Sequence, residues 1–159
     1  MALSSRGIPA SGLVLDDISK QIIEQLQEDG RRSYAAIGKA VGLSEAAVRQ
    51  RVQRLHETGV MQIVAVTDPL TLGFRRQAMI GLKCDGDLQH VAGQLAALEE
   101  IDYVVITAGS FDMLLEVVCE DDDHLLEILS RVRRVPSVTS TETFVYLKLC
   151  KQTYSWGTR

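Results

Sequence analysis

The stretch GRRSYAAIGKAVGLSEAAVRQRVQRLHETG, residues 30–59, decides the fold of the N-terminal half. Its apolar residues recur at helical spacing and predict a short helix over about 34–41 and a second over about 45–57. Ser33 and Ser44 stand where N-caps are needed, because a serine hydroxyl accepts a hydrogen bond from the first helical turn. Gly42 separates the two helices and Gly59 follows the second. The stretch is therefore predicted to be two helices joined by a tight turn.

The residues before this stretch predict another helix over 15–28, with Asp16 and Asp17 in its first turn. Three helices, of which the last two are joined by a short turn containing Gly, form a helix-turn-helix domain. The alternative is a helical hairpin whose arginines are only solvated, but the caps, the turn and the charge together favour DNA binding. Residues 60–66 alternate loosely and could add a strand or wing.

The charge distribution supports a nucleic-acid partner although the net charge is −4. Residues 1–68 hold eight Lys/Arg and eight Asp/Glu, whereas residues 69–159 hold nine and thirteen. Between 31 and 56 the only acid is Glu45. Local charge governs attraction to phosphates, and Arg and Gln can read guanine and adenine. The residues predicted to contact double-stranded DNA are Arg32, Ser33, Ser44, Glu45, Ala46, Ala47, Arg49, Gln50, Arg51 and Arg54.

The C-terminal half follows the turn Asp68-Pro69 and has a different pattern. We expect strands over 77–84, 103–108, 113–119 and 138–150, and helices over 88–98 and from about 121 to Pro136. This order is the ferredoxin-like βαββαβ arrangement, so the chain is predicted to be an α+β protein with a (winged) helix-turn-helix domain in front. A sheet with helices on one face needs cover on the other. Eight apolar strand residues exceed the need of one face and predict a sheet-to-sheet dimer: Ile80, Leu82, Val104, Ile106, Leu115, Val117, Val145 and Leu147.

Other classes find little support in the sequence. No run of about 18 apolar residues predicts a membrane span, and the first residues lack the apolar core of a secretory signal. Three cysteines without close or metal-ligand spacing suit a reducing cytoplasm and predict no metal and no cofactor. None of the three histidines stands near another catalytic group in the sequence, so we do not expect an enzyme.

Five stretches in order resemble the Lrp/AsnC family of feast/famine regulators. They are LDDISKQIIEQLQEDGRRS (15–33), VGLSEAAVRQRVQRLHETGV (41–60), DPLTLGF (68–74), ITAGSFDMLLEVVCED (106–121) and VPSVTSTETFVYLK (135–148). The resemblance implies a cytoplasmic, nucleoid-associated transcription regulator that dimerises through its C-terminal domain and often assembles into octamers. It also implies an amino acid or related metabolite as effector near a Gly-x-x-Asp turn. The corresponding residues are Ala108, Gly109, Ser110, Phe111 and Asp112, with Thr141 and Thr143 facing the ligand from a neighbouring dimer.

Three alternatives stay open beside this interpretation. Ala108 stands where the family commonly has Thr, which leaves a regulator without a small effector as one alternative. Sirohaem decarboxylases resemble the family in both halves, although a retained basic recognition helix argues against an enzyme. A stand-alone effector-binding module whose helix-turn-helix contacts protein is the third.

The expected organisation has five parts. Residues 1–12 form a flexible tail, 13–62 the helix-turn-helix domain, 63–76 a linker strand or hinge, 77–150 the ferredoxin-like domain and 151–159 a C-terminal tail. Tyr154 and Trp156 in the last part suggest that the tail docks on another surface, such as that of a neighbouring subunit, and a loosely packed tail is the alternative.

Overall fold

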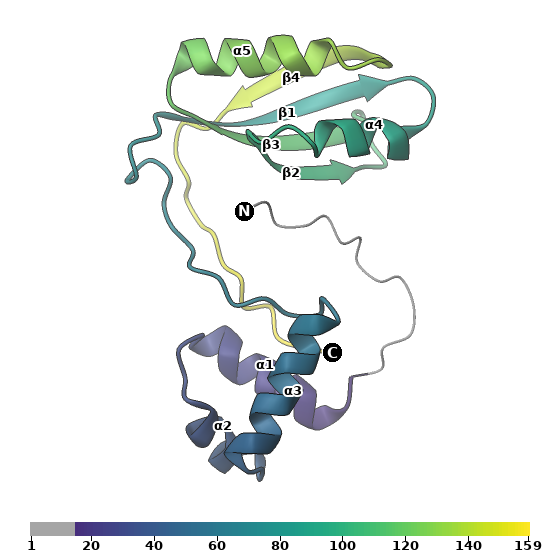
Figure 1. Ribbon diagram of the computed structural model, residues 1–159. Coiled ribbons are helices and arrows are strands. Elements are labelled where there is room, and N and C mark those ends of the chain that lie inside the picture. Colours follow the sequence, from purple (N-terminus) through teal and green to yellow (C-terminus); the bar gives the residue numbers. More distant parts are fainter. Residues whose placement is uncertain (1–14) are drawn as a thin grey trace. The chain divides into compact units, whose positions relative to one another are not determined.

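The computed structural model describes residues 15–159, so the tail expected over 1–12 lies outside the described residues. The chain forms two compact units, which are described separately (Figure 1). One contains residues 66–150. The other contains the described residues up to Ala65 together with Lys151–Arg159. No helix of the described residues is long and apolar enough to cross a membrane.

The N-terminal unit holds three helices, α1 (Asp17–Glu28), α2 (Tyr34–Val41) and α3 (Glu45–Glu57). Ser33 and Ser44 cap α2 and α3 as predicted, accepting hydrogen bonds from the backbone N–H of Ala36 and Ala47 at 3.2 Å. Asp16, expected inside the first turn, is instead the N-cap of α1. An aspartate caps well because its carboxylate accepts from the free N–H groups of the first turn. The core of this unit consists of Ile22, Leu26, Ile37, Val48 and Val52.

The turn between α2 and α3 closes tightly over Gly38. The N–H of Leu43 donates to the carbonyl of Gly38 at 2.9 Å, and a Cβ added at Gly38 would lie 2.5 Å from the Leu43 carbonyl oxygen. Gly42 ends α2 in the left-handed conformation, at φ 74°. Both glycines are therefore required by the backbone of the helix-turn-helix, one for space and the other for its conformation.

The strand or wing predicted for residues 60–66 is wrong, and so is the linker strand within 63–76. Residues 61–68 have no regular secondary structure, and β1 begins only at Arg76. A strand needs a partner for its backbone groups, and no segment of the described chain pairs with these residues. Met61 packs against the N-terminal core, while Ile63 and Val64 stay exposed.

The C-terminal unit contains β1 (Arg76–Cys84), α4 (Leu88–Leu95), β2 (Ile101–Ile106), β3 (Met113–Cys119), α5 (Asp122–Arg133) and β4 (Val138–Val145). The strands pair antiparallel in the order β2-β3-β1-β4, which confirms the predicted ferredoxin-like sheet. Several expected boundaries were wrong, among them the end of β2, which lies at Ile106 and not at residue 108, and the end of α5, which lies at Arg133. α4 ends at Leu95 and not at Leu98, because the chain turns through Leu98 towards β2. β2 begins at Ile101, two residues before the expected start at Tyr103. β4 ends at Val145, since its partner β1 begins at Arg76.

The two helices cover one face of this sheet. Ile80 and Leu82 of β1 and Leu115 and Val117 of β3 are fully buried against them, and Val104 and Ile106 pack on the same core. The apolar strand residues were expected to be enough for both faces of the sheet. This was wrong, because alternate residues of a strand point to opposite faces and all of these residues point to the same one. Val145 lies opposite Ala78 on that side, and Leu147 lies beyond the sheet, 98% exposed.

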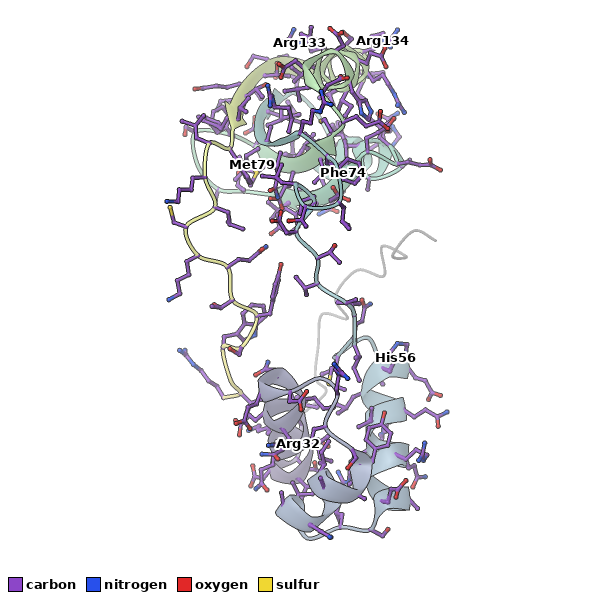
Figure 2. All side chains as sticks on the ribbon, turned by 90° about the vertical axis from the view of Figure 1, so that its left-hand side faces the viewer. Arg32, His56, Phe74, Met79, Arg133 and Arg134 are labelled. Atoms are coloured by element: carbon purple, nitrogen blue, oxygen red, sulfur yellow. The ribbon has the colours of Figure 1, made fainter. Side chains whose placement is uncertain are left out.

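The other face carries the residues of opposite parity and has no helix. Met79 of β1 lies opposite Phe144 of β4, and Leu114 of β3 lies opposite Val105 of β2. Arg133 and Arg134 lie at the end of α5, while Met79 lies on the far side of the sheet (Figure 2). We call this surface the open sheet face. It is partly apolar, with Tyr103 and Phe144 50% and 43% exposed.

Candidate nucleic-acid interface and effector loop

The exposed side of α3 is centred on Gln50. Val48, Val52 and Leu55 bury the opposite side of the helix. Glu45, Ala46, Gln50 and Arg54 are exposed, and Ala47 is half-buried. Within residues 15–159, the side chains of Gln50 and Arg54 form no hydrogen bond and no ion pair, and the hydrogen bond that Arg54 accepts from the Thr58 hydroxyl goes to its backbone carbonyl. These two long polar side chains are therefore available to an external partner.

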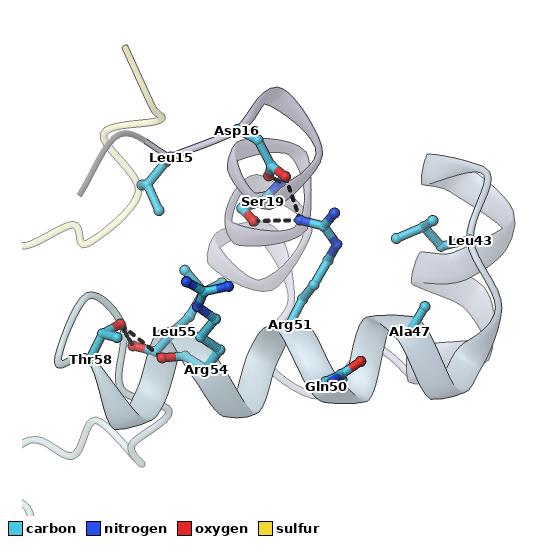
Figure 3. A pocket seen from close by; sticks show the side chains of 10 residues that line it. All are labelled: Leu15, Asp16, Ser19, Leu43, Ala47, Gln50, Arg51, Arg54, Leu55 and Thr58. Carbon is cyan, nitrogen blue, oxygen red and sulfur yellow. Dashed lines mark hydrogen bonds and ion pairs between the residues drawn. The ribbon is translucent and has the colours of Figure 1, made fainter.

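Arg51 points from α3 to the start of α1. Its guanidinium donates to the carboxylate of Asp16 at 2.6 Å and to the hydroxyl of Ser19 at 3.1 Å (Figure 3). The hydrogen bond from Ser19 and then that from Arg51 lower the pKa of Asp16 to about 2. Arg51 thus holds α1 and α3 together in this structure instead of projecting freely from the recognition helix.

Two other predicted DNA contacts are also held by neighbours. The Arg49 guanidinium donates to Glu45 at 2.8 Å and lies 5.2 Å from the centre of the Tyr34 ring. Arg32 donates to Glu28 at 3.1 Å and to Gln25. Such exposed pairs contribute little stability and exchange easily for phosphate contacts. Arg49 and Arg32 therefore keep their charge on the surface, but they are oriented along it.

A groove of about 480 Å³ separates the beginning of α1 from α3. The Asp16–Arg51 pair crosses it, and Ala47, Gln50 and Arg54 line its α3 side (Figure 3). The hydroxyls of Ser33 and Ser44 are occupied as helix caps. The structure thus gathers Ala47, Gln50, Arg51 and Arg54 on one groove, and places Arg49 and Arg32 outside it.

The loop between β2 and β3 is fixed by its own backbone. The N–H of Thr107 donates to the Asp112 carbonyl at 2.9 Å, and the Thr107 hydroxyl donates to the Phe111 carbonyl at 2.5 Å. One carboxylate oxygen of Asp112 accepts from the N–H of Cys84 at 2.9 Å. Within the described residues the N–H groups of 108–111 have no intramolecular acceptor. The loop therefore presents free donors above an anchored aspartate.

Phe111 connects this loop to the open sheet face. A Cβ added at Gly81 would lie 2.7 Å from the Phe111 ring, and the ring meets Phe144 edge to face with centroids 6.0 Å apart. Gly81 therefore makes room for the ring. Thr141 and Thr143 lie opposite Leu82 and Ile80, on the helix-covered face, and Thr141 accepts a hydrogen bond from Arg133. One chain thus does not bring the two threonines together with Phe111.

Comparison with known proteins agrees with this geometry. Residues 15–56 match the family model of the AsnC-type helix-turn-helix domain, and residues 74–159 match that of a C-terminal dimeric alpha+beta barrel domain. The HTH-type transcriptional regulator FL11 of Pyrococcus furiosus is 37% identical over 142 residues, which cover 88% of this chain and 94% of that protein.

The chain belongs to the Lrp/AsnC family. It is a transcriptional regulator with a DNA-binding helix-turn-helix, as the resemblance predicted, and its relatives are regulators and not enzymes.

Solved structures of Lrp/AsnC proteins share the fold of this chain. The leucine response regulatory protein of Mycobacterium tuberculosis is 26% identical with a TM-score of 0.79, and the match covers 87% of this chain and 96% of that one. A regulator of Neisseria meningitidis solved in complex with L-Met has a TM-score of 0.74 at 23% identity, covering 89% and 96%. The second likeness shows the fold alone.

Sequence reasoning missed several residues that shape these two sites. Ser19 and Asp16 hold Arg51, and only their helical spacing from one another is visible in the sequence. Thr107 precedes Ala108 and closes the loop between β2 and β3, a role that the Thr-Ala-Gly order could have suggested. Gly81 stands inside a strand, which is a known sign of close approach by another group. Among residues 15–159 no cluster of ligands for a metal ion occurs.

Proposed function

We propose that this Lrp/AsnC regulator reads operator DNA through Gln50 and Arg54, with Arg51 positioning the recognition helix. The observation that carries the proposal is the groove side of α3, where these two side chains are exposed and have no partner among the described residues. Gln can pair with adenine and Arg with guanine through two hydrogen bonds each. Arg49 and Arg32 supply positive charge that attracts phosphates.

The oligomer that would bind an operator in this way is a two-fold dimer formed through the open sheet face. An apolar sheet face without cover favours association, and the matching family model is that of a dimeric domain. Two recognition helices related by a two-fold axis suit two half-sites of one operator. Assembly of dimers into an octamer remains a family expectation.

A mobility-shift titration with the DNA upstream of the protein's own gene tests this proposal. Gln50→Ala and Arg54→Ala should each weaken specific binding by roughly 1–3 kcal/mol, about five- to 150-fold, because each removes a base contact. Gln94→Ala, an exposed glutamine on α4, is the matched control and should bind like wild type. Full affinity in both α3 variants would mean that α3 reads DNA through other residues.

We further propose that an amino acid or a related metabolite binds at the loop Gly109–Asp112. The free N–H groups of the loop suit a carboxylate, and Asp112 supplies negative charge for an ammonium group. One structural neighbour is named a leucine response regulatory protein and another was solved in complex with L-Met, and both names support an amino acid as the ligand class. Thr141 and Thr143 would have to come from another dimer, because in one chain they lie on the helix-covered face.

Asp112→Asn separates the two roles of this residue. The asparagine oxygen still accepts from the N–H of Cys84, so the loop should keep its shape, while the charge for the ammonium is lost. A thermal-shift screen with the twenty amino acids should stabilise wild type with at least one of them and the variant with none. The control Asp123→Asn changes an exposed acid elsewhere. A flat screen with wild type would favour the regulator without an effector.

A further inference from the structure

The C-terminal residues return to the DNA-binding domain. The chain passes from this domain into the C-terminal unit at Val66 and leaves that unit at Cys150, and residues 151–159 group again with the helix-turn-helix. The N–H of Gly157 donates to the Gln27 side chain at 3.1 Å, and the Thr158 hydroxyl donates to the Glu24 carboxylate at 2.5 Å. Both acceptors belong to α1.

The site on α1 is separate from the surfaces used for folding and DNA reading. Glu24 and Gln27 are three residues apart and share one side of the helix. Ile22 and Leu26 point instead into the core of the domain, and Asp16 and Ser19 face Arg51. A segment docked on Glu24 and Gln27 therefore leaves the groove beside α3 open.

Charge favours this docking. Residues 151–159, KQTYSWGTR, contain two basic residues and no acid. Residues 16–29, which include α1 and its caps, contain five acids against Lys20 alone. Although Asp16 and Glu28 pair with Arg51 and Arg32, no arginine or lysine among the described residues pairs with Glu24. Opposite charges attract over about 10 Å at 0.1 M salt, so the basic segment is drawn to the acidic helix before the two hydrogen bonds form. Gly157 has φ 72°, and in this left-handed conformation its N–H reaches Gln27.

We propose that residues 151–159 are a clasp that docks on the Glu24–Gln27 side of α1 in the same chain and gives the DNA-binding domain a second tether. With one linker, the domain would swing about residues 66–75 only. With the clasp closed, two chain segments join it to the C-terminal domain and limit its orientations. The clasp thereby raises the effective concentration of the second recognition helix once the first is bound to DNA.

The single tryptophan of the chain, Trp156, reports the docking directly. Its ring is 78% exposed and lies next to Gly157 in the docked segment. The variant Glu24→Ala/Gln27→Ala removes both acceptors. The fraction of Trp156 fluorescence that depolarises within nanoseconds should then rise about twofold, because an undocked segment moves on that timescale. Asp17→Ala/Gln21→Ala changes an acid and an amide elsewhere on α1 and should leave the anisotropy decay unchanged. An equal decay in wild type and both variants would overturn the clasp.

The same variants test the tether on DNA, a step that rests on the proposed binding to two half-sites. Affinity for a two-half-site operator should fall about three- to tenfold in Glu24→Ala/Gln27→Ala, with affinity for one half-site unchanged. An equal loss on both DNAs would place Glu24 or Gln27 in DNA binding and contradict the tether. If no form binds DNA, the proposed function fails, whereas the tryptophan result still decides the docking.

Docking between chains is distinguished by a mixed sample of isotope-labelled and unlabelled protein. NMR contacts of the Gly157 and Thr158 protons with α1 should connect only residues of the same labelled chain. Intermolecular contacts between a labelled tail and an unlabelled α1 would overturn docking within one chain and make the segment an exchanged arm of the dimer.

Discussion

Asp16 accepts a hydrogen bond from the N–H of Ser19 and another from the Arg51 guanidinium, and these contacts lower its pKa to about 2. In the unfolded chain the carboxyl has its ordinary pKa of about 3.8. A carboxyl whose pKa is lower in the folded state stabilises that state at pH values above its unfolded pKa. The contribution is lost as the pH falls from about 4 to about 2.

Asp16→Asn tests this residue because asparagine also caps helices but carries no charge. At pH 7 the variant should melt at a lower temperature than wild type. The difference should shrink as the pH falls from about 4 to about 2 and disappear below that, where Asp16 is protonated in both states. Thermal melts followed by circular dichroism at a series of pH values measure this. A difference between the two melts that is constant from pH 7 to pH 2 would show that the Asp16 charge is not coupled to folding.

At the scale of elements, the sequence predicted the helix-turn-helix more closely than the ends of the strands. Serine caps, glycine breaks and apolar spacing are local signals, so α2 and α3 came out with their observed bounds. The end of β4 and the absence of a wing depend on which strand has a partner, and that is decided by tertiary pairing. Likewise, Arg51 was predicted to contact DNA, whereas it binds Asp16 and Ser19 at the start of α1. No local signal in the sequence shows that these two residues lie opposite Arg51.

Gly38 is the element-scale position with the sharpest prediction. Gly38→Ala should destabilise the DNA-binding domain by about 1–3 kcal/mol, because the added Cβ meets a backbone oxygen that cannot move without opening the turn. Gly93→Ala in α4 meets nothing within 4 Å and should stabilise its helix by about 0.5–1 kcal/mol. Urea unfolding of the two variants compares them. Equal effects at both glycines would contradict the tight turn.

At the scale of the whole molecule, the open sheet face is the surface that the proposed dimer buries. This dimer was expected from the sequence, but on the wrong side chains, because the sequence alone does not distinguish burial by α4 and α5 from burial by a second copy. Met79, Leu114 and Phe144 are among the residues that the structure leaves on that face, with Tyr103 and Val105 of β2. Phe111, from the loop between β2 and β3, joins them through its contact with Phe144.

Met79→Lys places a charge in the middle of this face, where a second sheet would remove water from it. The dimer should weaken by more than about tenfold, since removing a charge from water is costly even though Glu116 lies opposite on β3. Leu126→Lys, on the exposed side of α5 with its leucine 61% exposed, is the control and should not alter the assembly. Sedimentation velocity over a concentration series measures both. An unchanged dimer in Met79→Lys would rule out the open sheet face as its interface.

The measurement that tests the central claim most directly is the base specificity of Gln50. Wild type and Gln50→Ala would be titrated against operators that carry every single-base substitution. We predict that the variant loses discrimination at one base pair in each half-site and keeps it elsewhere, because a base contact acts locally while phosphate contacts act on every sequence. A uniform loss of affinity, or an unchanged specificity profile, would contradict the assignment of α3 as the helix that reads the operator through Gln50.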